Sequence, residues 1–163
     1  MKIKYFYLLS FVIIFIGLFN SLRFTISTGN QPWFDDRLCI DARHYKRGMS
    51  SIVTSNDFFN LKNMSQSPGY QIYLAVVYKI FPDDNKIFKI IKMISWIMSL
   101  LSTGLIFYLG EKYFDKYVGA VSAALFSFSY KYYVYINLLQ YEVLLGFLLL
   151  LYVYFLVELE SSQ

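Results

Sequence analysis

One run of residues decides the expected fold: Phe34-Asp35-Asp36-Arg37-Leu38-Cys39-Ile40-Asp41-Ala42-Arg43-His44-Tyr45-Lys46-Arg47. It packs three carboxylates, four cations and the chain's only histidine into fourteen residues, within a polar segment that covers residues 31–70. The chain on both sides of this segment is mostly apolar. Polar groups close to membrane spans are energetically costly, so a cluster of them indicates a functional site at a membrane surface.

The composition predicts a membrane protein. Of the 163 residues, 57% are hydrophobic and 16% are charged, whereas an ordinary soluble domain is about 45–50% apolar and about 25% charged. The net charge of +4 comes from scattered cations mixed with acids, which argues against a nucleic-acid groove and suits anionic lipid or phosphate groups. The single cysteine, Cys39, excludes an intramolecular disulfide.

Apolar blocks of membrane-spanning length predict an all-α, polytopic fold with about four transmembrane helices. Eighteen helical residues rise about 27 Å, which nearly covers the hydrocarbon core of a bilayer. A cleaved signal peptide is the alternative for the first block, but that block is long and no A-x-A site follows it. Three spans remain an alternative if residues 117–157 pair differently. The expected spans are residues 5–22, 90–110, 117–133 and 138–158.

The expected loop between the first two spans, residues 23–89, contains two short interfacial helices. Asp41 is expected to be the N-cap of the first, over residues 41–53, because its carboxylate can accept backbone N–H bonds. Ser67 and Pro68 predict the start of the second, over residues 68–81, with proline at the first helical position. The second helix is too short to span a membrane, and its apolar residues recur at three- and four-residue spacing.

The inward face of the first loop helix is also predictable from spacing. Tyr45, Met49 and Ile52 fall on one helical face, and Gly48 lies beside them. Farther along the chain, the loop ends in a row of lysines that we expect to anchor the next span in the lipid headgroups. These lysines are Lys86, Lys89 and Lys92.

The charges give conflicting indications of orientation. Lys2 and Lys4 favour a cytoplasmic N-terminus, which places the first large loop outside. Residues 23–92 then carry ten Lys and Arg outside, while the link 111–116 carries two inside. The positive-inside rule applies to loops of up to about 60 residues, and this loop is longer, so the outside placement is retained.

Several motifs follow one another in an order typical of one enzyme group. They are Asp41-Ala42-x-x-Tyr45, Ser67-Pro68-Gly69-Tyr70, Tyr108-Leu109-Gly110-Glu111-Lys112-Tyr113-Phe114, the small-residue stretch of residues 118–126, and Glu142 at the start of the last span. This order resembles the N-terminal part of GT-C-fold membrane glycosyltransferases. That group includes the dolichyl- and polyprenyl-phosphate-sugar-dependent mannosyltransferases and the lipid A aminoarabinose transferases. The resemblance covers nearly the whole chain.

The resemblance implies an inverting enzyme in a bacterial plasma membrane that moves a sugar from a polyprenyl-phosphate donor to an acceptor on the outer face. Its partners would be the polyprenyl-phosphate-linked sugar and membrane lipid, with no nucleic acid. Members of the group are longer, so residues 1–163 are expected to form a single truncated GT-C-like domain. A fragment, an inactive remnant and a split gene product with a C-terminal partner chain are the alternatives.

The resemblance also makes Asp41 the catalytic base that deprotonates the acceptor hydroxyl. From the sequence pattern alone, a helix N-cap is the simpler explanation, and the two roles are compatible. Arg43, Lys46 and Arg47 are candidates for holding the donor phosphate, for which arginine offers a bidentate fork. A solvated or headgroup-facing surface is the alternative for each of these cations.

Tyr45 and Glu142 complete the predicted substrate-binding set, together with Arg43 and Arg47. Glu142 is expected either to face the substrate cavity or to lie at the membrane interface. No cofactor is certain. His44 could join Asp41 or Asp35 around a divalent metal, but one histidine without a second His or Cys cluster is weak support for a metal site.

A non-enzymatic role is the competing hypothesis. The same helices would serve a small lipid-binding or assembly subunit of a membrane complex. The enzyme hypothesis requires the polar loop to form a defined site at the ends of the membrane spans.

Overall fold

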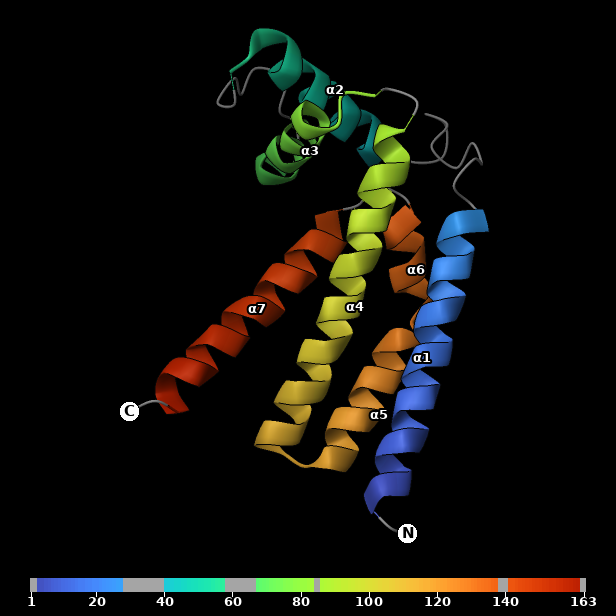
Figure 1. Ribbon diagram of the computed structural model, residues 1–163. Helices are drawn as coiled ribbons and strands as arrows, with labels where there is room; N and C mark the ends of the chain where they lie inside the picture. The colour runs from blue at the N-terminus through green and yellow to red at the C-terminus, as the bar shows by residue number, and fades with distance from the viewer. Residues whose placement is uncertain (1–2, 28–39, 58–66, 84–85, 138–140, 162–163) are drawn as a thin grey trace.

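The computed structural model describes residues 3–27, 40–57, 67–83, 86–137 and 141–161. Every regular element within these ranges is a helix, which confirms the all-α class. Figure 1 shows α2 and α3 at one end of a helical bundle, and the start of α1 and the end of α7 at the other. The helices are α1 (Ile3–Ser27), α2 (Ile40–Ser55), α3 (Pro68–Ile80), α4 (Ile87–Tyr113), α5 (Lys116–Ser127), α6 (Tyr130–Asn137) and α7 (Tyr141–Ser161).

Three helices of the described chain are long and apolar enough to cross a membrane. They cover Tyr5–Ser27, Ile87–Tyr113 and Tyr141–Glu160 and overlap the predicted first, second and last spans. The first two helices are longer than the predicted spans. The chain is therefore an integral membrane protein. The extra length comes from polar helix ends, because a helix does not stop where its apolar residues stop.

The prediction of one continuous helix over residues 117–133 is wrong. The chain forms α5 and then α6, separated by Phe128 and Ser129. At the break, the Ser127 hydroxyl donates to the Ala124 carbonyl at 2.8 Å, and the Ser129 N–H donates to the Phe126 carbonyl at 3.0 Å. Figure 1 shows α6 continuing in the direction of α5. Twenty helical residues rise about 30 Å, so the pair together has the length of one membrane crossing.

The bundle buries small and polar residues and exposes large apolar ones. Phe11, Phe15 and Phe19 are exposed along one side of α1, with successive ring centroids 6.4 and 6.3 Å apart. Lipid tails are as apolar as these rings, so the hydrophobic effect does not drive the rings inward, and helices in membranes associate through small residues instead. The small and polar residues buried between the helices include Ser21 and Thr25 of α1, Ser95, Ser99, Ser102 and Thr103 of α4, and Gly119, Ala120, Ala123 and Ser127 of α5.

Two glycines bring α4 and α5 into backbone contact. A Cβ on Gly110 would lie 2.6 Å from the Gly119 Cα, and a Cβ on Gly119 would lie 2.6 Å from the Phe107 carbonyl oxygen. The intervening turn is fixed by Asp115, whose carboxylate accepts the N–H groups of Tyr117 at 2.7 Å and Val118 at 2.8 Å. The α4–α5 hairpin is therefore tightly specified at the end of the bundle away from α2.

The same end carries polar contacts between helices. Glu158 of α7 pairs with Lys112 of α4, with Nζ and Oε1 2.7 Å apart, and accepts the Tyr108 hydroxyl at 2.6 Å. The Tyr7 hydroxyl of α1 donates to Glu111 of α4. These contacts tie α1 and α7 to α4 where the bundle meets the polar surface.

The three lysines at the start of α4 do not share one role. Lys86 and Lys89 are exposed, whereas Lys92 is 2% exposed and lies among the buried residues of α4. A spacing of three residues covers about 300°, so each lysine is rotated about 60° from the previous one. By the third lysine the side chain has turned into the bundle, and the prediction of a headgroup anchor at Lys92 is wrong.

Candidate functional site

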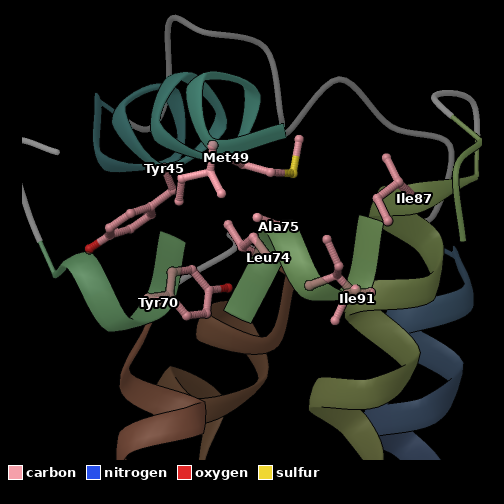
Figure 2. Packing of buried hydrophobic residues seen from close by; sticks show 9 residues of the cluster. Tyr45, Met49, Tyr70, Leu74, Ala75, Ile87 and Ile91 are labelled. Carbon is pink, nitrogen blue, oxygen red and sulfur yellow. The ribbon is translucent and has the colours of Figure 1, made fainter. Parts of the chain in front are cut away.

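The candidate site lies where α2 rests on α3 and on the ends of α4 and α7. The buried side of α2 is formed by Tyr45, Met49 and Ile52, as its spacing predicts. Figure 2 shows Tyr45 and Met49 of α2 facing the apolar cluster of α3 and α4. The other buried members are Tyr70, Leu74, Ala75 and Val77 of α3 and Ile87 and Ile91 of α4. This cluster fixes α2, which carries residues 40–47 of the polar run.

Gly48 allows α2 and α3 to approach each other closely. A Cβ at position 48 would overlap the carboxamide of Gln71, which is fully buried. A larger residue at position 48 would displace the Gln71 side chain from this contact. The glycine therefore leaves room for the Gln71 carboxamide between α2 and α3.

Tyrosines form the part of the cluster nearest to α7. The Tyr45 ring packs edge-on against Tyr70 with centroids 4.9 Å apart, and its centroid lies 6.5 Å from that of the Tyr141 ring. Tyr70 also stacks on Tyr73 at 5.7 Å. Such aromatic pairs prefer edge-to-face or offset geometry and add specificity to burial. The cluster brings α2, α3 and the first turn of α7 together.

Two of these tyrosines stay neutral at physiological pH. Burial, followed by the neighbouring Tyr73, Tyr45 and Glu142, raises the pKa of Tyr70 well above its ordinary value. Burial alone raises the pKa of Tyr73 to about 12. Within the described ranges, neither hydroxyl has a hydrogen-bond partner. A neutral phenol keeps its proton, so the Tyr70 hydroxyl remains a hydrogen-bond donor.

The structure brings together some of the predicted site residues. Tyr45 is 1% exposed and belongs to the tyrosine cluster, and Glu142 lies in the first turn of α7 near Tyr70. A carboxylate in that position also interacts favourably with the positive end of a helix. Arg47 is exposed on α2, away from the cluster. The substrate-binding roles of these three residues stay predictions.

Asp41 and Arg43 lie in the first turn of α2, and their side chains are outside the described part of the structure. The helix begins at Ile40, one residue earlier than expected, so Asp41 is a first-turn residue and not the N-cap. The helical register places position 41 one turn before Tyr45, at the end of α2 nearest to the tyrosine cluster.

A hollow of about 420 Å³ lies between α2, α3 and the start of α4. Its polar side is lined by Lys46, Ser50 and Thr54, and the Lys46 ammonium lies 5.5 Å from the centroid of the Phe88 ring. Lys46, one of the three cations predicted to hold a phosphate, therefore lines this hollow. The sequence pattern was not used to predict Ser50 and Thr54, although successive spacings of four residues place Lys46, Ser50 and Thr54 on one helical face.

A metal site remains a prediction. Within the described ranges, no three His, Cys, Asp or Glu residues lie close enough together to hold a metal ion. Asp35 and the side chain of Asp41, the predicted partners of His44, lie outside those ranges.

The comparison with known families decides between the competing hypotheses. Residues 65–163, more than half of the chain, match the family described as dolichyl-phosphate-mannose-protein mannosyltransferase. The chain belongs to this family. No curated protein and no solved structure matches the chain.

Membership in the mannosyltransferase family confirms the resemblance to GT-C-fold glycosyltransferases. The matched residues include all of α3 to α7, and α2 with the polar run lies before them. The protein is a membrane glycosyltransferase of the mannosyltransferase type. The family match does not cover α2. The apolar cluster nevertheless packs α2 against α3 and α4, which lie within the matched residues.

Proposed function

We propose that this chain forms the N-terminal part of an inverting glycosyltransferase that uses a polyprenyl-phosphate-linked sugar. The family match carries the proposal, because the family is described by a dolichyl-phosphate-linked mannose, which is a sugar of this class. The acceptor would receive the sugar on the outer face of a bacterial plasma membrane. A C-terminal partner chain would supply further spans if the gene is split.

Asp41 is the proposed catalytic base. Its carboxylate would take the proton of the acceptor hydroxyl while that oxygen attacks the anomeric carbon. The bond between the anomeric carbon and the phosphate oxygen breaks, and the polyprenyl phosphate leaves with the bonding electrons. A single base on the attacking side is sufficient, since the leaving phosphate needs little protonation.

Cations of α2 are the proposed partners of the departing phosphate. Lys46 lines the hollow and supplies its positive charge. The neighbouring hydroxyls of Ser50 and Thr54 donate to the carbonyls of Lys46 at 2.9 Å and Ser50 at 2.8 Å, so each would have to rotate away from the helix backbone to donate to a phosphate oxygen. Arg43 and Arg47 lie on the same helix, and charge-assisted hydrogen bonds to phosphate are among the strongest in proteins. The charges on α2 therefore suit an anionic leaving group at the membrane surface.

Proteoliposomes that contain the full-length gene product, with any partner chain co-expressed, are expected to transfer labelled mannose from polyprenyl-phosphate mannose. The family description motivates mannose as the first sugar to test. Transfer is measured as label in the acceptor fraction of a membrane extract, and liposomes without the protein serve as the control. Transfer from a nucleotide-activated mannose in the absence of the lipid-linked donor would contradict the proposal.

A cysteine at position 55 is expected to react with a membrane-impermeant maleimide added to intact cells. Ser55 is exposed at the end of α2, on the side of the membrane proposed to be outer. The experiment uses a Cys39→Ala background, and Lys116→Cys, at the start of α5 and the opposite end of the bundle, is the matched control. Labelling at position 116 but not at position 55 would reverse the proposed orientation.

A further inference from the structure

The outer face of α4 carries an apolar groove that has no part in the proposed reaction. The groove has a volume of about 500 Å³ and is nearly all apolar along its length. Phe81, just after α3, forms one wall, and Met93, Ile94 and Ile97 of α4 form the floor. Lys86 and Lys89 lie at one end.

This groove lies on the side of α4 that faces lipid. The buried side of the helix contains Ser95, Ser99 and Ser102, whereas Ile97 is 47% exposed. Because α4 is a membrane span, an exposed apolar side chain at this depth contacts hydrocarbon. The groove is therefore open to a lipid molecule without any rearrangement of the bundle.

Charge is confined to the end of the groove at the start of α4. The Lys86 side chain is 74% exposed, and its Nζ lies 3.1 Å from the Asp83 carboxylate, an exposed pair of the kind that is weak in water. Lys89 is exposed one turn farther along the helix. From Lys89 to Ile97 the helix rises about 12 Å, close to the roughly 15 Å of hydrocarbon in one leaflet.

We propose that this groove binds one anionic phospholipid of the surrounding bilayer. Its phosphate contacts the ammonium groups of Lys86 and Lys89, and one acyl chain lies along Met93, Ile94 and Ile97. Lys92 takes no part, because it is buried on the other side of α4. A transmembrane helix of another protein fits this groove less well, since it would press two ammonium groups against apolar side chains.

The test titrates phosphatidylglycerol and phosphatidylcholine with the same acyl chains onto the full-length protein in a neutral detergent. Native mass spectrometry counts the bound lipids. Phosphatidylglycerol is expected to bind more tightly, and a Lys86→Gln/Lys89→Gln variant is expected to bind it about 30-fold more weakly, since each lysine near a lipid surface contributes about fivefold. Lys116→Gln, at the opposite end of the bundle, is the matched control and leaves binding unchanged.

A second variant tests the apolar part of the groove separately. Ile97→Trp fills the floor, so it is expected to weaken phosphatidylglycerol binding while the unfolding temperature without lipid stays the same. Equal affinity for the two lipids, or unchanged binding in the lysine variant, would overturn the proposal. Displacement of phosphatidylglycerol by an equal concentration of polyprenyl phosphate would also overturn it, by assigning the groove to the substrate lipid. Lipid retention is measured without transferase activity, so the result does not depend on the proposed reaction.

Discussion

Replacement of Asp41 by asparagine in the full-length protein is expected to lower the rate of sugar transfer by about 10²–10⁴-fold, the usual contribution of a general base. Asparagine keeps the size of the side chain and its ability to accept backbone N–H bonds, but it cannot take a proton. The loss is expected in kcat, because the donor would still be held by the cations of α2. The measurement is the initial rate of label transfer from the lipid-linked donor.

The matched control for this experiment is Asp57→Asn. Asp57 is an exposed carboxylate just beyond the other end of α2, so its replacement removes the same charge from the same polar segment. The control is expected to retain the wild-type rate. Unchanged transfer by the Asp41 variant, or an equal loss in both variants, would remove Asp41 from the mechanism. Unfolding temperatures of both variants show whether a loss of rate reflects chemistry or loss of the fold.

Substitution of Gly119 by alanine is expected to destabilise the protein by about 1–3 kcal/mol, and substitution by valine by more, as for other overpacked positions. The new Cβ would lie 2.6 Å from the Phe107 carbonyl oxygen and 2.7 Å from the Glu111 nitrogen. Both contacts are with backbone, which cannot rotate away as a side-chain end can. The measurement is the unfolding temperature in lipid nanodiscs, where the membrane environment of α4 and α5 is kept.

Gly104→Ala provides the matched control for this prediction. Gly104 lies in α4 as well, and a Cβ on this residue would have no heavy atom of another part of the described chain within 4 Å. Alanine favours the helix by up to about 1 kcal/mol over glycine, so this variant is expected to be neutral or slightly more stable. Equal unfolding temperatures for the Gly104 and Gly119 variants would contradict the close backbone contact between α4 and α5.

Glycines 110 and 119 are expected to act as one unit. Each glycine lies against the backbone of the opposite helix, so a Cβ on either one separates the same pair. Once one substitution has separated α4 from α5, the second has fewer backbone contacts left to disrupt. The loss of unfolding free energy in the double variant is therefore expected to be smaller than the sum of the losses in the two single variants. The contact matters for the whole bundle, because α4 also carries the polar contacts to α1 and α7 at that end.

The sequence indicated the membrane class, the three long spans and both loop helices. Long uncharged runs mark spans because hydrophobic length depends only on residues that are adjacent in the chain. The spacing of Tyr45, Met49 and Ile52 likewise marked the buried side of α2. The order of motifs indicated the glycosyltransferase family, which the match over residues 65–163 confirms.

The break between α5 and α6 had no clear signal in the sequence. Residues 117–130 are uncharged, and nothing in their order marks Phe128 and Ser129 as the end of a helix. In the structure, a Cβ on Gly17 of α1 would lie 2.9 Å from the Ser127 carbonyl oxygen, so the break is packed against a distant helix. A local pattern cannot report a contact of this kind.

By itself, the sequence determined that this chain is helical, crosses a membrane and gathers its charges between two spans, because each of these properties follows from neighbouring residues. Only the tertiary structure decided which side of α4 faces inward and which aromatic rings of different helices meet. It turned Lys92 into the bundle while Lys89 stayed outside, and it placed Tyr45 between Tyr70 and Tyr141. The physical reason is that these positions depend on contacts between helices far apart in the chain, which the order of neighbouring residues does not contain.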